Sequence, residues 1–540
     1  EDEDGVRPQI NFGYSLFGTS PNEFRRLTSR TEKIGPSNNL VTAYSYDNVY
    51  KYVLKDVVVD SGGLELTTTF MFNDFGDVLL VDGPRTDVLD FTTTLWDIHR
   101  RLMSKVDPDR DGIGFQLRPA TKYTYDLDSQ LVQTEFGTAT SGVGSNFIAF
   151  ERTTYDYDAV GNKLRDTVID VATGDPLAIT QYSYDDLDRL DCTAVRMNAA
   201  VFGSLPTSAC THSTLGSFGP DRITRSEYDP ASQLLKTIRA YGTALQQDYA
   251  TYTYTDNGQQ ATVEDANGNL STFEYDGVDR LAKLRFPDLT SGAGTSSTTD
   301  YEEYGYDPNG NRTSWRKRDG SVIGYSYDNL NREIVKDIPG GSVNDVYSGY
   351  DLLGRRLYAR FASDVGQGIT YTYDKPGRLL TETSFGKTLS YQYDPANNRT
   401  RITWPDSLYV DYTYDPGNRM VEVRENGATS GPGLLAVYDY DDIGRRTDLT
   451  RSNGVTTTWG YDGMSRLTSL VQDPAGSSED LTVGLSYNPA SGIVSRSASN
   501  DSYAWTNHSP GTTDYAAANG LNQYTAIDSD PPVVRFPLSS

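Results

Sequence analysis

Short stretches in which polar and aromatic residues alternate recur along the chain, and each is followed by a turn signal. In residues 371–373, Tyr-Thr-Tyr alternates with the period of two that is typical of a strand. Asp374 comes next, and an aspartate there starts a turn by accepting hydrogen bonds from backbone N–H groups just ahead. In fuller copies a glycine such as Gly161 supplies the positive φ that ends the turn. The pattern predicts one β-hairpin per unit, with the following Arg/Leu segment as the returning strand.

The unit recurs so regularly that chance composition does not explain it. From Tyr306 to Tyr487, successive copies lie 20 to 26 residues apart. We assign a structural role to the following motif residues: Tyr125, Asp126, Tyr157, Asp158, Gly161, Tyr184, Asp185, Tyr275, Asp276, Tyr306, Asp307, Gly310, Tyr327, Asp328, Tyr373, Asp374, Tyr393, Asp394, Tyr414 and Asp415. An active site needs one arrangement rather than about seventeen copies, so the repetition argues against catalysis by these pairs.

The number of units predicts the fold class. Seventeen or so hairpins amount to roughly 30 strands, whereas open sheets rarely exceed about 10 strands without curling or splitting. Strand twist has one hand, so curling accumulates, and curling also protects sheet edges. No segment shows a sustained helical period. We therefore predict an all-β chain, a long spiralling antiparallel sheet of consecutive β-hairpins.

These motifs resemble the YD-repeat (Rhs/teneurin-like) family, which includes bacterial polymorphic-toxin shells. The resemblance covers about residues 40–500 and implies a sheet that forms a hollow YD-repeat shell or barrel. Rhs shells usually end in a segment with an aspartate-dependent self-cleavage site, followed by a variable toxin. No match to that segment is found here. The resemblance therefore leaves two expectations, a fragment of a longer protein or a shell without a passenger.

The repeat also sets the expected domain boundaries. Residues 1–40 lack the motif and are predicted to be an N-terminal cap or tether, and residues 41–500 the YD-repeat β-shell. An irregular segment at about 192–220 interrupts the period and is predicted to be an inserted loop. Residues 501–540 are predicted to begin a C-terminal segment, with truncation of that segment as one expectation.

Composition and charge narrow the class of protein. The apolar fraction is only 36%, but aromatic residues make up 11%, which a disordered acidic chain would not contain. The net charge of −26 disfavours nucleic-acid binding, which needs a cationic surface. The sequence has no run of about 18 consecutive apolar residues that would suggest a membrane-spanning helix. Its first residues, Glu-Asp-Glu-Asp-Gly, do not resemble a signal peptide.

Few residues other than the repeat suggest chemistry. Asp107, Asp109 and Asp111 alternate like the start of a calcium loop, but Arg118 at its twelfth position cannot complete an EF-hand, so an acidic turn is favoured. Cys192 and Cys210 are predicted to form a disulfide, with two reduced thiols as the alternative. With three histidines in the chain, a histidine-based metal site is not expected, and no cofactor is predicted.

Three functions remain open. The first is a non-catalytic secreted or bacterial cell-surface shell that encloses or shields a polypeptide cargo such as a toxin. The second is a carbohydrate-binding or adhesion module with a cell-surface glycan or protein partner, because tyrosine rings stack on sugars. The third is a polysaccharide lyase using Tyr with Arg or His, although an acidic substrate would meet a protein of charge −26. We favour the shell; fold alone does not fix function.

Overall fold

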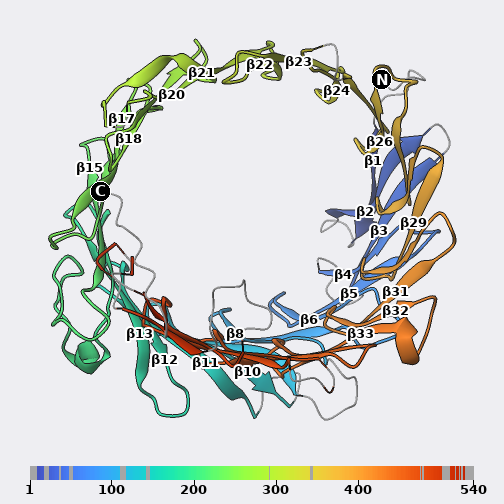
Figure 1. The fold of residues 1–540 in the computed structure, drawn as a ribbon. Coiled ribbons are helices and arrows are strands. Elements are labelled where there is room, and N and C mark those ends of the chain that lie inside the picture. Colours follow the sequence, from blue (N-terminus) through green and yellow to red (C-terminus); the bar gives the residue numbers. More distant parts are fainter. Residues whose placement is uncertain are drawn as a thin grey trace. The chain divides into compact units, whose positions relative to one another are not determined.

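In the computed structural model, nearly every described element is a β-strand (Figure 1). The structure describes residues 9–17, 24–35, 38–47, 53–109, 117–140, 146–290, 292–340, 344–474, 476, 479–500, 511–516, 519–521, 523–524 and 527–529. Among these residues the exceptions are two short 3-10 helices, η1 (Ala199–Ser204) and η2 (Gly431–Gly433). The search of the same residues finds no helix with the length and hydropathy of a membrane span. The predicted all-β character is confirmed.

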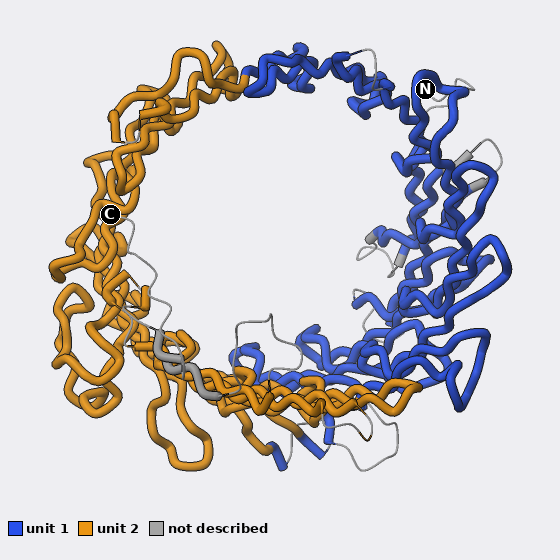
Figure 2. Tube along the Cα trace, viewed as in Figure 1, with its two compact units in different colours: residues 1–120, 139–147, 303–438 blue, residues 121–138, 148–302, 439–540 orange. Residues whose placement is uncertain are grey.

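The chain divides into two compact units, which Figure 2 shows in blue and orange. Unit 1 comprises residues 1–120, 139–147 and 303–438. The strands wholly within it are β1 (Ile10–Phe17), β2 (Phe24–Gly35), β3 (Asn38–Tyr46), β4 (Leu54–Val59), β5 (Leu66–Phe72), β6 (Val78–Asp82), β7 (Thr92–Trp96), β8 (Leu102–Val106), β22 (Arg312–Arg316), β23 (Val322–Tyr327), β24 (Glu333–Asp337), β25 (Val346–Tyr350), β26 (Arg356–Phe361), β27 (Gly368–Tyr373), β28 (Leu379–Ser384), β29 (Lys387–Tyr393), β30 (Arg399–Thr403), β31 (Tyr409–Tyr414) and β32 (Met420–Glu425).

Unit 2 comprises residues 121–138, 148–302 and 439–540. The strands wholly within it are β11 (Ile148–Tyr157), β12 (Lys163–Ile169), β13 (Pro176–Tyr184), β14 (Leu190–Val195), β15 (Arg222–Tyr228), β16 (Leu234–Arg239), β17 (Gln247–Tyr254), β18 (Gln260–Asp265), β19 (Leu270–Tyr275), β20 (Leu281–Pro287), β34 (Arg446–Arg451), β35 (Thr456–Tyr461), β36 (Leu467–Asp473), β37 (Leu481–Tyr487), β38 (Ile493–Ala498), β39 (Gly511–Tyr515) and β40 (Ile527–Ser529). Four strands include residues of both units: β9 (Arg118–Tyr125), β10 (Leu131–Ala139), β21 (Ser296–Tyr306) and β33 (Leu434–Tyr440).

Within each unit, strands that follow one another along the chain pair antiparallel, as β23 and β24 do in unit 1 and β13 and β14 do in unit 2. The register shifts by one residue just before the last tyrosine of a repeat strand. Ser326 is opposite Val335, whereas Tyr327 is opposite Glu333, so Ile334 has no partner across the pair. The same shift occurs before the final tyrosines of β11, β19, β27, β29 and β31. This recurrent β-bulge increases local twist, and the sequence pattern did not predict it.

The described residues form 40 strands, more than the roughly 30 that the motif count predicts. Part of the excess comes from segments without the motif. Residues 1–40, predicted as a cap or tether, contain β1, β2 and the start of β3, which pair in sequence with one another. Within 501–540, β39 and β40 also pair antiparallel. Alternating side chains thus make strands where the Tyr-Asp signature is missing.

Little of the described chain is buried, because the sheet is covered by half-exposed side chains rather than by a second layer of helices. Packing between elements is mainly between consecutive strands. Two small apolar clusters are fully buried. One in unit 1 is formed by Val106, Ala120 and Ala139, and one in unit 2 by Cys192, Ala194, Ala209 and Ile223. Most of the sheet is therefore stabilised by contacts between neighbouring hairpins rather than by a thick hydrophobic core.

In unit 1, one segment without the motif contacts repeat turns far along the sequence. Arg85, between β6 and β7, is almost fully buried, and its Nη1 donates to the carbonyl oxygen of Asp415 at 3.0 Å. Its Nε lies 4.0 Å from the Asp394 carboxylate. Lys375 Nζ similarly lies 3.3 Å from Asp60. These contacts join the early and late segments of unit 1.

Candidate functional site

The motif aspartates close the hairpin turns. In the unit at Asp328, carboxylate Oδ1 accepts the backbone N–H groups of Leu330 and Arg332 at 2.9 and 3.0 Å. Asn331 N–H donates to the Asp328 carbonyl at 3.0 Å and has a positive φ of 60°. Gly161 and Gly310 occupy the equivalent position in their units with φ of 99° and 88°. The aspartate is therefore a turn cap, as the sequence predicted.

In several units, an arginine four residues after the aspartate connects the turn to the next one. Arg355 Nε donates to Asp351 Oδ2 at 2.5 Å, and its Nη1 donates to the carbonyl oxygen of Asp374 in the following unit at 2.7 Å. Its guanidinium also lies 5.1 Å from the ring centroid of Tyr373, a cation–π distance. The same bond to the next turn is donated by Arg189, Arg332, Arg378, Arg445 and Arg466. The repeat pattern predicts this arginine on the return strand but does not predict the bridge.

The last tyrosine of many repeat strands connects its turn to the preceding unit. Tyr373 donates its hydroxyl to the carbonyl oxygen of Arg356 at 2.9 Å, and Tyr393 donates to that of Leu379 at 2.9 Å. Equivalent bonds are made by Tyr157, Tyr184, Tyr275, Tyr327, Tyr414, Tyr461 and Tyr487. Tyr125 and Tyr306 also end their strands, β9 and β21. The hairpins are thus joined by two kinds of bond, one from the arginine and one from the tyrosine.

The protonation of these groups suits a structural role. Burial raises the pKa of the Tyr327 and Tyr393 phenols above the ordinary value, so they remain hydrogen-bond donors at neutral pH. The Arg189 side chain lowers the pKa of the Asp185 carboxyl, and the backbone N–H of Arg280 does the same for Asp276. These carboxylates are therefore ionised acceptors. A tyrosine base would instead need a lowered pKa.

The segment predicted as an inserted loop is a compact lobe, residues 196–221, between β14 and β15. Cys192 lies inside β14 rather than in the loop, and the structure joins it to Cys210 in a disulfide. The Arg196 side chain is 0% exposed and pairs with Asp221 at 2.7 Å. Its remaining donors bond the side-chain oxygen of Gln181 and backbone carbonyls of the lobe. These partners on several sides of the guanidinium offset the desolvation cost of burying its charge.

The possible metal ligands are largely engaged otherwise. In the described part of the chain, the grouping that could hold a metal is Asp191, Cys192 and Cys210, and its two sulfur atoms are in the disulfide. For the calcium hypothesis, Asp107 pairs with Lys105 at 2.7 Å, whereas Asp111 lies outside the described residues. The acidic turn therefore stays the prediction for Asp107, Asp109 and Asp111, with calcium binding as its untested alternative.

Two open grooves offer binding surface on the sheet. In unit 1, a groove of about 590 Å³ is lined by Tyr347, Tyr350 and Tyr358 together with motif residues Asp328 and Arg332. The aspartate and arginine bond each other at 2.6 Å and are the pair that closes a turn.

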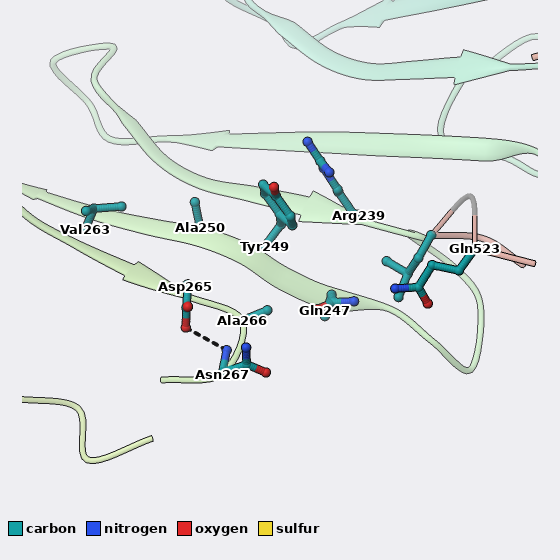
Figure 3. A pocket seen from close by; sticks show the side chains of 10 residues that line it. Arg239, Gln247, Tyr249, Ala250, Val263, Asp265, Ala266, Asn267 and Gln523 are labelled. Carbon is teal, nitrogen blue, oxygen red and sulfur yellow. Dashed lines mark hydrogen bonds between the residues drawn. The ribbon is translucent and has the colours of Figure 1, made fainter. Parts of the chain in front are cut away.

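In unit 2, a groove of about 420 Å³ is lined by side chains from β16, β17 and β18 and by Gln523 (Figure 3). The Arg239 guanidinium lies 3.4 Å from the ring centroid of Tyr249. Asp265 accepts the Asn267 N–H at 2.8 Å, the dashed line in Figure 3, and so caps its own turn. The groove combines an aromatic, a cation and amides, which suits binding rather than acid–base chemistry.

Comparisons with known proteins find the same repeat in parts of this chain. The teneurin YD-shell model matches residues 219–348, and the RHS repeat model matches residues 440–478. Two curated relatives are "tRNA3(Ser)-specific nuclease WapA" of Bacillus spizizenii, 25% identical over 225 residues, and "Double-stranded DNA deaminase toxin A" of Burkholderia cenocepacia, 26% identical over 247 residues. The matches cover 40% and 42% of this chain but only 9% and 16% of the relatives.

Solved structures show the same fold. The crystal structure of TcdB2-TccC3-TEV aligns over 97% of this chain and 31% of that chain, with a TM-score of 0.51 and 14% identity. TcdB2-TccC3 without its hypervariable C-terminal region aligns over 96% and 30%, with a TM-score of 0.53 and 12% identity. The predicted fold class, that of the YD-repeat shells, is confirmed. Together, the hairpin repeat and these matches show that the chain resembles the YD-repeat (Rhs/teneurin-like) family.

Proposed function

We propose that this chain is part of a non-catalytic shell that encloses or shields a polypeptide cargo, such as a toxin. The observation that carries the proposal is the use of the repeat side chains. The motif tyrosine, aspartate and arginine of successive units bond to each other and to neighbouring backbone, as at Asp351, Arg355 and Tyr373. A wall built in this way can lengthen unit by unit without a new core, which suits enclosure.

The named relatives support this proposal. Both curated relatives bear the names of nucleic-acid-modifying enzymes, one of them a toxin, and this chain matches only a small share of each. The shell fold would then be the portion that such proteins share with this chain, and any toxic activity would belong to other portions. We extend the proposal to location: a disulfide persists mainly in oxidising compartments, so a secreted or cell-surface shell fits Cys192–Cys210.

Cargo protection provides the first test. An unstructured reporter with one protease site is fused after Ser540 of the full chain and exposed to that protease. We expect much slower cleavage than for the same reporter fused to an unrelated folded protein. A denatured sample of the fusion should lose this protection, which shows that it depends on the fold. Equal cleavage rates in the two folded fusions would overturn the proposal.

The lyase alternative has a separate test. A lyase that uses tyrosine needs a phenol that loses its proton readily, whereas burial raises the pKa of Tyr327, Tyr393 and Tyr461. We expect no rise in ultraviolet absorbance from unsaturated sugar when the chain is incubated with a panel of acidic polysaccharides. Sustained release of such products would show that the chain is an enzyme.

A further inference from the structure

The disulfide of unit 2 lies beside a carboxylate. Asp191 and Cys192 are neighbours in β14, and Cys210 belongs to the lobe that follows this strand. A carboxylate oxygen of Asp191 and the two sulfur atoms lie within 4.8 Å of one another. Cys192 is fully buried, whereas Asp191 and Cys210 are partly exposed. A group of three metal-ligand types is therefore assembled where solvent reaches two of its members.

The two oxygens of the Asp191 carboxylate have different neighbours. Oδ1 accepts the Nε–H of Arg225 at 2.9 Å, and Oδ2 lies 3.2 Å from Cys210 Sγ. A sulfur atom in a disulfide carries no proton, so this second contact is not a hydrogen bond in the oxidised chain. An anionic oxygen is thus directed at a sulfur atom without a donor between them. A proton or a cation shared by the two atoms, available only after reduction, would make the contact attractive.

Arg225 fixes the carboxylate from behind. Its Nη1 donates to the Tyr241 hydroxyl at 2.9 Å, and its guanidinium lies 5.1 Å from the centroid of the Tyr241 ring. Carboxylates that bind metals are commonly held by an outer hydrogen-bond partner of this kind. The guanidinium also contributes charge, because a divalent cation together with this one arginine balances two thiolates and one carboxylate.

We propose that Asp191, Cys192 and Cys210 bind one zinc ion once the disulfide is reduced. Thiolates and carboxylates both ligate zinc, and three protein ligands leave the fourth tetrahedral position for water. Calcium and magnesium take oxygen ligands, so the mixed set favours zinc over them. In a reducing compartment, zinc would tie β14 to the lobe as the disulfide does in an oxidising one. This inference does not rest on the proposed shell function.

Reduction and zinc binding are separate steps. A phosphine reductant gives two electrons to the disulfide and takes the oxygen of one water molecule to become a phosphine oxide. The two protons of that water leave both cysteines as thiols. In a cell, a dithiol would supply the same electrons and protons and become a disulfide. Zinc then displaces the thiol protons, because the thiolate is the form that binds metal.

The metal content of the full chain tests the proposal. One sample is reduced with phosphine and desalted under nitrogen, and a second is kept oxidised. Both are incubated with zinc chloride and desalted again. We expect about one zinc ion per reduced chain and only background zinc in the oxidised chain. Equal zinc in the two samples would mean adventitious binding to surface carboxylates, and that result or the absence of zinc from the reduced chain would overturn the proposal.

Variants identify the ligands in the reduced chain. Asp191→Asn should weaken zinc binding by roughly tenfold or more, because it removes the anionic ligand. Asp186→Asn is the matched control, since it removes an exposed carboxylate from the turn that precedes β14. This control variant should keep the original affinity. Equal losses in the two variants would overturn the role of Asp191.

Cobalt(II) reports the sulfur ligands directly, because cobalt–thiolate bonds give a charge-transfer absorption that carboxylate complexes lack. We expect this absorption in the reduced chain, and we expect Cys210→Ser to lower it. Zinc should also slow proteolysis of residues 196–221 in the reduced chain, which shows that the metal holds the folded lobe. Cobalt bound without the thiolate absorption, or zinc bound without protection of the lobe, would overturn the proposed site.

Discussion

The repeats around β23–β28 and the lobe between β14 and β15 keep the chain ordered in different ways. In the repeats, Arg332, Arg355 and Arg378 make the same bonds from one turn to the next, at partly exposed positions. In the lobe, a single buried pair, Arg196 and Asp221, is combined with one disulfide. Stabilisation is divided among many small contacts in the first region and concentrated in two contacts in the second.

This difference predicts how each region loses its structure when one contact is removed. In a repeat array, stability is approximately a sum of unit and neighbour terms, so losing one contact should loosen one unit and its neighbours. In the lobe, breaking the buried ion pair leaves a buried charge without its ionic partner, so a single change should have a large effect. The following experiments compare the two regions, starting with the largest expected effect.

Alkaline pH should disrupt the repeats before the lobe. Burial raises the pKa of Tyr327, Tyr373 and Tyr393. A group with a raised folded pKa contributes stability that is complete below its unfolded value, about 10, and is lost as pH rises through the folded pKa. Residues 196–221 contain no tyrosine. We expect the β-sheet ellipticity to fall as tyrosinate absorbance rises above about pH 10. At the same pH, protease should cleave within the repeats before it cleaves within the lobe. Tyrosinate forming without loss of sheet would contradict this.

Asp221→Asn should damage the lobe more than a matched change damages a repeat. The Asp221 carboxylate accepts from Arg196 and from the backbone N–H groups of Met197 and Ser213. Removing its charge leaves a buried guanidinium without its partner, at a cost of about 3–5 kcal/mol. Hydrogen exchange of amides 190–225 would measure the loss. Asp276→Asn, in a repeat turn, is the control, and equal losses of protection at both sites would contradict the contrast.

Reducing the disulfide should loosen the lobe and leave the repeats unchanged. Cys192 and Cys210 are 18 residues apart in sequence, and closing a loop of that size contributes about 3 kcal/mol. We expect faster proteolysis within 196–221 when reductant is added. A Cys192→Ala and Cys210→Ala double variant should show the same fast proteolysis with or without reductant. Faster proteolysis of the repeats on reduction would show that the disulfide stabilises more than the lobe.

Arg355→Gln should weaken one repeat and its neighbours. The change removes the ion pair with Asp351, the bond to the Asp374 carbonyl and the cation–π contact with Tyr373. Hydrogen bonds to charged groups contribute about 1.5–3 kcal/mol each where solvent is excluded. Because these groups are partly exposed, we expect the variant to lose about 2 kcal/mol of local unfolding free energy in total. Hydrogen exchange of amides 346–384 would measure this loss of local stability.

A surface pair provides the control for Arg355→Gln. Arg165 and Asp156 form an exposed ion pair at 2.6 Å, and exposed pairs contribute about 0–1 kcal/mol. Arg165→Gln should therefore change hydrogen exchange little. Loss of protection throughout unit 1 after Arg355→Gln, rather than near residues 346–384, would mean that the unit unfolds as one cooperative body.

The sequence predicts those parts of the fold that local chemistry determines. Alternation before Tyr327 marks β23, and Asp328 marks the turn, because an aspartate directly after a strand can accept bonds from the N–H groups just ahead of it. Gly161 and Gly310 have the predicted positive φ. These features repeat, so each copy supports the interpretation of the others.

Contacts that depend on distant segments could not be predicted in the same way. Arg85 donates to Asp415, 330 residues away, and nothing in the sequence around Arg85 repeats. Arg196 likewise occurs once, and its burial depends on how the lobe folds over it. The bridge from Arg355 to Asp374 was detectable in principle, because an arginine recurs four residues after many motif aspartates. Its partner in the next turn is set by how neighbouring hairpins pair, which only the structure shows.

The smallest expected effect comes from a single tyrosine hydroxyl. Tyr393→Phe removes the bond to the Leu379 carbonyl but keeps the ring, which lies 5.2 Å from the Arg378 guanidinium. One neutral hydrogen bond contributes about 1 kcal/mol. Hydrogen exchange of amides near 379–394 should therefore change less than for Arg378→Gln, which removes the bonds to both turns. If the phenylalanine variant were the more damaging of the two, the tyrosine hydroxyls, and not the arginine bridges, would hold consecutive hairpins together. Stability divided among many tyrosines would then explain the wall without the arginines.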